Sequence, residues 1–342
     1  MKVTKIPGCG SQGVFIDDLD FTKITDDEWM EVGRIHLREL ITIIRNVKLD
    51  ERSYLKWARM LGRDRLNWGR LMWARYPQAN GNVYKLLKDP SLSDADRRVL
   101  KEYFRIRVGG IKSRHGDMLK VSGIRDKNGN RIGMFADGEL TWHSNESGDI
   151  CFTPNVCLLG VKGMTKSATG FQTTTDYYYS LPDSFRSELD EMVLVHNFKP
   201  YAINPGLNEE QDAFIMNMNI CHDPDVEIPM VIQSPGGVKG LHYSYNSVTH
   251  IKGMSEHDSE LILSQIRKDL EKYSWDYWWE NDNDLILFDN TILQHRRLGD
   301  TTDRMALRYA HDLDGVGGEY IPYFQEEYIE RYKKRKSILD EL

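Results

Sequence analysis

The first sixty residues alternate between strand and helix patterns. Residues 13–20 alternate apolar and acidic side chains, as a half-buried strand does, and Thr25 then offers a helix N-cap before a run of acids. We predict a helix over 26–39. The β-branched run at 41–44 predicts the next strand, and apolar residues at i, i+3 and i+4 predict an amphipathic helix over 49–61.

From about residue 120 the pattern changes to short strands separated by turns. Asn128-Gly129 stands between two apolar runs, 120–124 and 131–135, and predicts a hairpin. Further strands are predicted at 140–143, 156–162, 170–174, 216–219, 230–234, 240–245, 285–288 and 305–310, with helices at 184–192 and 255–273. Many short strands with a few inserted helices predict a mainly β protein: a double-stranded β-helix, the jelly roll of cupins, flanked by α-helices.

We expect a single domain over 1–342. With 40% hydrophobic residues in 342, the chain has enough apolar surface for one large core. The segment 63–115 is polar, aromatic and helical in pattern, and we interpret it as a helical insertion or lid. The tail over 315–342 is charged and helical in pattern, typical of a solvated packing helix. The aromatic run at 273–279 predicts an edge strand and a loop.

Charge and composition narrow the class of partner. The net charge is −7, and basic residues are interspersed with acidic ones, so we expect no nucleic acid. No apolar stretch reaches bilayer length and no signal peptide is evident, which predicts a cytoplasmic protein without a membrane contact. The four cysteines form no CxxC pair, so neither a disulfide framework nor a zinc site is indicated. A small-molecule substrate is the expected partner, and a homo-oligomer is compatible with this picture.

Two of the ten histidines stand apart by their context. His143 ends a predicted strand and enters a polar turn, and His295 follows an apolar strand and a short turn. Two neutral imidazoles and a carboxylate on one face of Fe(II) leave the other face open for a chelating cosubstrate and O₂. Arg304 and Arg308 follow at a spacing that puts both on one face of a strand, where an arginine can bind a carboxylate. From spacing alone, two core-edge histidines and two surface arginines explain the pattern as well.

The segments around these residues resemble the TauD/TfdA family of Fe(II)- and 2-oxoglutarate-dependent dioxygenases, which is related to the clavaminate-synthase-like enzymes. The likeness covers about residues 10–312 and is poorest at 63–114. It is carried by Gly-Glu-Leu-Thr-Trp-His at 138–143, Lys-Ser-Ala-Thr at 166–169, Gln-His at 294–295 and Arg-Met-Ala-Leu-Arg at 304–308. The resemblance implies a jelly-roll enzyme that uses Fe(II), 2-oxoglutarate and O₂ to hydroxylate or otherwise oxidise a small polar metabolite, while 2-oxoglutarate is converted to succinate.

The resemblance also implies roles for single residues. His143 and His295 would be the iron-binding imidazoles. Arg304 would bind the distal carboxylate of 2-oxoglutarate, assisted by Thr169. Arg308 would lie beside the cosubstrate or face an anionic group of the substrate.

The sequence departs from the family at the third metal ligand. The family has His-x-Asp or His-x-Glu, whereas this chain has Asn145 in His143-Ser-Asn145. Three interpretations are open: the Asn145 amide oxygen coordinates iron, a bulge turns Glu146 inward, or water or an anion such as chloride fills the position, as in related halogenases that carry Gly or Ala there. Two other functions therefore stay open beside hydroxylation: a radical halogenase-like enzyme and a catalytically silent binding relative.

Overall fold

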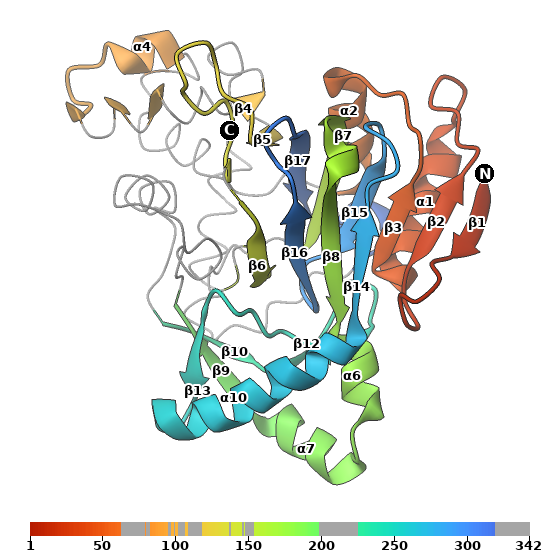
Figure 1. Cartoon of the computed structure of the whole chain (residues 1–342), viewed down its shortest axis with the longest axis vertical. Coiled ribbons are helices and arrows are strands. Elements are labelled where there is room, and N and C mark those ends of the chain that lie inside the picture. Colours follow the sequence, from red (N-terminus) through yellow and green to blue (C-terminus); the bar gives the residue numbers. More distant parts are fainter. Residues whose placement is uncertain are drawn as a thin grey trace.

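The protein is built on two packed β-sheets with helices on the outside (Figure 1). The computed structural model describes residues 1–62, 79, 83–94, 97–98, 100–101, 107–108, 118–136, 138–145, 147, 154–197 and 225–318. The predicted jelly-roll architecture is confirmed, although the strands in the described part of the chain form separate sheets and do not close into a barrel.

The large sheet has eight strands. All its neighbours pair antiparallel except β2 and β3, which are parallel. Its order is β1 (Lys2–Lys5), β2 (Val14–Asp17), β3 (Ile41–Ile44), β15 (Leu285–Asp289), β7 (Asn155–Lys162), β17 (Met305–His311), β5 (Met118–Ser122) and β4 (Arg107–Val108).

The small sheet has four antiparallel strands and faces the large one. Its order is β14 (Ser274–Trp278), β8 (Ser167–Thr173), β16 (Leu293–Gly299) and β6 (Leu140–His143). The aromatic run at 273–279 thus forms an edge strand, as predicted. Two further small sheets pair β10 (Val226–Pro229), β9 (Val193–His196) and β13 (Val248–Ile251), and β11 (Val231–Gln233) with β12 (Lys239–Leu241).

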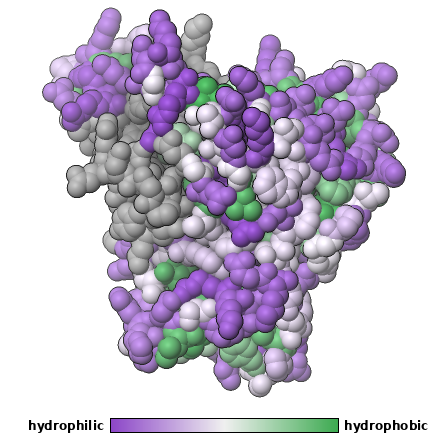
Figure 2. Space-filling view, in the orientation of Figure 1, coloured by the Kyte–Doolittle hydropathy of each residue, from purple (hydrophilic) through white to green (hydrophobic). Residues whose placement is uncertain are grey.

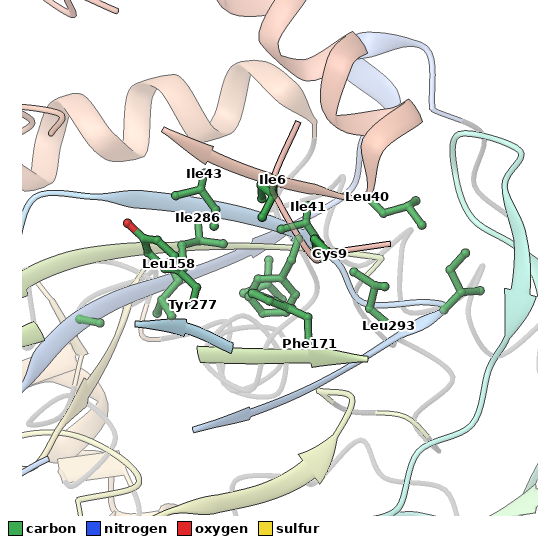
Figure 3. Packing of buried hydrophobic residues seen from close by; sticks show 14 of the residues in the cluster. Ile6, Cys9, Leu40, Ile41, Ile43, Leu158, Phe171, Tyr277, Ile286 and Leu293 are labelled. Carbon is green, nitrogen blue, oxygen red and sulfur yellow. The ribbon is translucent and has the colours of Figure 1, made fainter. Parts of the chain in front are cut away.

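The main core lies between the two sheets and follows from the two-residue period of the strands. Ile286 of β15 joins Phe171 of β8 and Leu293 of β16 in one cluster of buried side chains (Figure 3). Phe288, two residues after Ile286 on the same strand, belongs to this cluster too. Leu287, which alternates with them, belongs to a second cluster on the opposite face of the large sheet. A strand buried on both faces reads as a continuous apolar run, which is what residues 285–288 show.

Two N-terminal helices cover that opposite face. They are α1 (Asp26–Glu39) and α2 (Glu51–Leu61). Thr25 and Glu28 form a capping box at the start of α1, so the predicted helix start is confirmed. The Tyr54 hydroxyl of α2 donates to the carbonyl of Cys157 at 2.9 Å and fixes the helix on β7.

The other helices are α4 (Val83–Leu87), α6 (Thr174–Ser180), α7 (Asp183–Glu191) and α10 (Glu256–Leu270), with short 3-10 turns at η3 (Met164–Lys166), η4 (Glu271–Tyr273) and η5 (Asp314–Val316). Among them, α6, α7 and α10 lie together beside the two smallest sheets, whereas α4 lies at the opposite end of the molecule, near β4 (Figure 1). A third buried cluster joins Leu263 and Ile266 of α10 to Leu194 of β9 and Leu241 of β12. This packing gives the small sheets an apolar side of their own.

Some sequence predictions need correction. The predicted hairpin turn forms, and backbone hydrogen bonds such as Ile132 N–H to Ile124 O and Met134 N–H to Lys120 O join its two arms, but the second arm, 131–135, makes only bridges and no full strand. The helix predicted over 255–273 ends at Leu270 and tightens into η4. The strand at 216–219, most of the insertion at 63–115 and the tail beyond residue 318 lie outside the described residues.

The visible surface is largely hydrophilic, with small scattered apolar areas (Figure 2). Among the described residues, no helix combines the length and the apolar character that a bilayer crossing requires.

Candidate active site

His143 and His295 lie directly opposite each other on neighbouring strands of the small sheet. They are register partners in the antiparallel pair β6 and β16, and the register shifts before Arg297 pairs with Leu140, with one extra residue on the β6 side. Their ring centroids are 4.1 Å apart. Both side chains are buried, with 4% and 9% exposure. The structure therefore brings together the two histidines that the sequence singled out.

Hydrogen bonds fix which nitrogen of each ring carries the proton. His143 Nδ1 lies 2.7 Å from the carbonyl oxygen of Thr141, which can only accept, so Nδ1 donates. His295 Nε2 lies 3.2 Å from the amide nitrogen of Asn145, which can only donate, so Nε2 accepts. His295 Nδ1 is buried without a hydrogen-bond partner. Each ring is thus left with its lone pair on Nε2, the form in which imidazole binds a metal.

Both imidazoles are neutral near pH 7. Burial lowers the pKa of His143 to about 4, and the positive charges of Arg308 and Arg297 act in the same direction. Burial also holds the pKa of His295 well below its usual value, with further contributions from His143 and Arg308. No proton therefore has to be displaced before a metal binds at neutral pH.

Arg304 and Arg308 both line the pocket above the two histidines, as their spacing predicted. Arg304 stands just before β17 and is 2% exposed, and its Nε has no hydrogen-bond partner. Burial, followed by the nearby charge of Arg297, lowers the pKa of Arg304 to about 9. A buried guanidinium with an unused donor is a strong binding group for a carboxylate. Arg308, on β17, donates from Nη1 to the Asn145 Oδ1 at 2.8 Å.

Thr169 of β8 has its hydroxyl oriented by a neighbour. The Trp279 Nε1 donates to Thr169 Oγ1 at 3.1 Å. A hydroxyl that accepts from an indole keeps its own hydrogen for another acceptor. Thr169 also lines the pocket, so this hydrogen can be donated to a carboxylate bound there.

Two contributors were missed in the sequence. Trp279 lies in the aromatic run, where nothing distinguished it from a packing residue. Arg297 lines the pocket and donates to the carbonyls of Phe135 and Gly138 at 2.6 and 2.5 Å, which ties that loop to the small sheet. Its position two residues after His295 on a strand was a usable signal, because such residues share a face.

The pocket lies between the two sheets and has one apolar wall and one cationic side. The apolar wall is formed by side chains from both sheets and the adjoining loop: Val121, Phe135, Leu140, Val156, Leu158 and Phe288. Phe288 packs against the His295 ring at a centroid distance of 4.7 Å and restricts its rotation. Oriented polar groups facing an apolar wall are typical of a small-molecule site.

Asn145 reaches the same pocket from a turn. The strand β6 ends at His143, and Asn145 lies in the turn that follows. Asn290 holds the turn, because its side chain exchanges hydrogen bonds of 2.8 Å with the backbone N–H and carbonyl of Asn145. Glu146, the alternative carboxylate, lies outside the described residues.

The donor set fits a divalent iron at two protein positions. Two neutral imidazoles are the nitrogen ligands of the two-histidine, one-carboxylate iron sites. Among the described residues, no three His, Cys, Asp or Glu side chains come close enough together to hold a metal ion. The third side chain at the site is the neutral amide of Asn145.

Other histidines belong to the core. His36 Nε2 lies 2.7 Å from Asn155 Oδ1, and His311 Nε2 lies 3.1 Å from Cys157 Sγ. All four side chains are buried.

Comparison with solved structures shows the same fold in other proteins. The structure of AAD-2 in complex with Mn(II) and N-oxalylglycine is 16% identical, with 94% of this chain and 98% of that chain covered and a TM-score of 0.61. A taurine dioxygenase from Burkholderia xenovorans is 17% identical, with 91% and 89% covered and a TM-score of 0.59. At these identities the likeness establishes the fold. A sequence search of curated proteins finds no match.

The family is established by a match over nearly the whole described chain. The model of the family described as "Taurine catabolism dioxygenase TauD, TfdA family" matches residues 2–310. Fe(II) and 2-oxoglutarate are the metal and cosubstrate of this family, as the resemblance implied. The chain therefore belongs to the TauD/TfdA family and is a 2-oxoglutarate-dependent non-haem iron oxygenase.

Proposed function

We propose that the protein hydroxylates a small, polar, anionic metabolite, with His143 and His295 as its iron ligands. The observation that carries this proposal is the opposed pair of neutral imidazoles, each with its lone pair on Nε2, beside a buried arginine. When bound, Fe(II) and 2-oxoglutarate supply the oxidising power, since O₂ is reduced while 2-oxoglutarate is converted to succinate and CO₂.

Arg304 and Thr169 bind the distal carboxylate of 2-oxoglutarate in this proposal. Arg304 offers an unpartnered Nε in a buried position, and Thr169 has a hydroxyl hydrogen left over after accepting from Trp279. Together they would form a charge-assisted contact and a neutral one, which fixes the orientation of the keto acid.

Arg308 faces the anionic group of the substrate. It lines the pocket, and its Nη1 donates to Asn145 Oδ1 at 2.8 Å, which holds the guanidinium beside the two histidines. The apolar wall opposite, which includes Leu158 and Phe288, would receive the carbon that reacts and keep water away from it. A small metabolite with one anionic end and an aliphatic stem fits a pocket that has an arginine on one side and an apolar wall on the other.

We also propose that the chain acts as one oxygenase domain. The support is that β1, at residues 2–5, and β17, at residues 305–311, belong to the same sheet. The cytoplasmic location and the oligomeric state stay predictions.

The test is succinate formation from 2-oxoglutarate in the full-length protein supplied with Fe(II) and O₂, against a panel of small carboxylates, sulfonates and amino acids. We expect one class of anionic compound to stimulate succinate formation and to gain one oxygen atom. The variant R304A should lose this activity, whereas R34A, at an exposed position on α1, should keep it. Succinate formation that no anionic compound stimulates would contradict the proposed substrate class.

A further inference from the structure

Phe135 lines the pocket from a left-handed backbone conformation. Its φ is +53°, a value that glycine adopts freely and that costs free energy in a residue with a bulky side chain. The side chain is half-buried and belongs to the lining of the pocket. Such a conformation persists only where the surrounding contacts over-determine it, and strained residues of this kind cluster at ligand-binding sites.

Arg297 holds this conformation from the small sheet. Its guanidinium donates to the carbonyl oxygen of Phe135 at 2.6 Å and to that of Gly138 at 2.5 Å. Both bonds are charge-assisted, and Arg297 is 4% exposed, so water competes little for them. We call these two bonds the Arg297 latch. The latch fixes the backbone at Phe135 and again three residues later.

The latch lies near Arg304. The positive charge of Arg297 is the second cause, after burial, of the lowered pKa of Arg304, so the two guanidinium groups are close together. The backbone beside Phe135 also contacts the residues that precede Arg304, because Thr301 Oγ1 donates to the carbonyl of Ala136 at 3.3 Å. Phe135 therefore lies at the end of the pocket that holds Arg304.

Gly123, directly after β5, permits this close packing. A Cβ at this position would lie 1.8 Å from the carbonyl oxygen of Thr301 and 3.0 Å from that of Ala136. The N–H of Gly123 donates to the carbonyl of Arg304 at 3.1 Å. The end of β5, the backbone beside Phe135 and the residues before β17 are thus packed as one unit.

We propose that Phe135, positioned by Arg297, is a specificity-determining residue for the cosubstrate, and that its ring selects the five-carbon 2-keto diacid over longer homologues. This inference rests on the proposed function, because it takes Arg304 as the group that binds the distal carboxylate. Arg304 fixes the charged end of the keto acid, whereas the apolar ring limits the length of the chain that fits. A homologue with one more methylene would have to displace the ring, and the latch resists that displacement.

The experiment compares 2-oxoglutarate with 2-oxoadipate, which is one methylene longer, by isothermal titration calorimetry of the full-length Mn(II)-loaded protein. We expect wild type to bind 2-oxoglutarate at least about tenfold more tightly, the lower end of what one methylene costs in a fitted site. F135A should lower this ratio to about threefold or less, mainly by binding 2-oxoadipate more tightly. F185A, the same truncation at a half-buried position on α7, should keep the wild-type ratio.

Variants of Arg297 test its positioning role. R297M should lower the ratio as F135A does, and the double variant should lower it no further, because Arg297 acts through Phe135. R297K keeps the charge but not the planar fork, so its ratio should lie between those of R297M and wild type.

The left-handed backbone is tested separately by urea unfolding of F135G and F135A. We expect the higher midpoint in F135G, the reverse of the usual order of these two residues, because only glycine adopts this φ without strain. A higher midpoint in F135A would contradict the strained conformation on which the inference depends.

Three further outcomes would overturn the inference and leave the proposed function intact. They are equal affinity of wild type for the two keto acids, an unchanged ratio in F135A, and an equal loss of both keto acids in R297M, which would show that Arg297 contacts the cosubstrate itself. An R304A protein that binds 2-oxoglutarate as tightly as wild type would overturn the proposed function as well.

Discussion

Asn290 and Asn145 exchange two hydrogen bonds of 2.8 Å each, side chain to backbone, at the turn that follows His143. Both residues are buried. Asn290 follows β15 and Asn145 follows β6, so this contact connects the large sheet to the small sheet beside the site. The position of the third side chain at the site therefore depends on a residue that does not itself line the pocket.

We predict that removing the Asn290 side chain lowers the stability of the folded protein strongly. N290A leaves the backbone N–H and carbonyl of Asn145 buried without these partners, at about 1–3 kcal/mol for each group. We expect the free energy of unfolding to fall by about 2–4 kcal/mol in a urea titration. N290D places a buried carboxylate oxygen against the carbonyl of Asn145, acceptor against acceptor, so it should cost at least as much as N290A. N128A, in the exposed turn after β5, serves as the control. An N290A protein as stable as wild type would show that the turn has other support.

Arg304 predicts a specific defect in cosubstrate binding. R304K keeps the positive charge but loses the fork that holds a carboxylate by two bonds. We expect KM for 2-oxoglutarate to rise about 10- to 100-fold with a smaller change in kcat, which corresponds to a charge-assisted bond of about 1.5–3 kcal/mol. Steady-state kinetics with varied 2-oxoglutarate measure it. The matched control is R34K on the exposed face of α1. An unchanged KM in R304K would place the distal carboxylate elsewhere.

Because Trp279 donates a hydrogen bond to Thr169, we predict that substitutions of these two residues have non-additive effects on KM for 2-oxoglutarate. T169V removes the hydroxyl at nearly constant shape, and KM for 2-oxoglutarate should rise about 3- to 10-fold, the equivalent of one neutral hydrogen bond. W279F removes the donor that orients this hydroxyl and should give a smaller rise. Because Trp279 acts through Thr169, the double variant should bind 2-oxoglutarate no worse than T169V alone. Independent, multiplying effects in this cycle would refute the positioning role.

Buried histidines away from the site predict how stability changes with pH. Burial lowers the pKa of His36 and His242 to about 4 and holds that of His196 well below its usual value. Between about pH 4 and 6.5 the unfolded chain binds protons that the folded chain does not, so stability is full above pH 6.5 and falls as the pH drops. Burial raises the pKa of Asp289 to about 6, and this group acts in the opposite direction below pH 6. The histidines outnumber it, so the net effect is acid destabilisation.

The pH effect is tested on the metal-free protein by urea unfolding at pH 7.5, 6 and 5. We expect H36Q to lower the slope of the unfolding free energy against pH by about 1.4 kcal/mol per pH unit near pH 5, the value for one proton. The exposed His257 gives the control H257Q, which should leave the slope unchanged. A slope in H36Q equal to that of wild type would mean that His36 titrates normally in the folded protein.

Much of this fold was predictable because its signals are local. The capping box of Thr25 and Glu28 lies within four residues, and the apolar run of β15 reports burial on both faces of a strand. By contrast, β9, β10 and β13 are only four residues long, and they form strands because they pair with segments distant in the sequence. Such strands leave little periodicity in the sequence.

The residues of the candidate site also differ in whether local sequence signals could predict their roles. His143 and His295 were recognisable because each follows a strand pattern. The orientation of Asn145 was not, because Arg308, 163 residues away, sets it. The role of Trp279 likewise depends on a partner 110 residues away. Contacts of this range are fixed by strand register, which no single segment of the sequence contains.

The most direct test of this account is Fe(II) binding by the variants H143Q and H295Q, measured by anaerobic equilibrium dialysis in the presence of 2-oxoglutarate. The exposed-histidine variant H257Q is the matched control, and circular dichroism confirms that each protein is folded. We predict one Fe(II) per chain in wild type and H257Q, and an affinity at least about 100-fold lower in both H143Q and H295Q. Wild-type iron affinity in either folded ligand variant would contradict the assignment of these two imidazoles as the iron ligands.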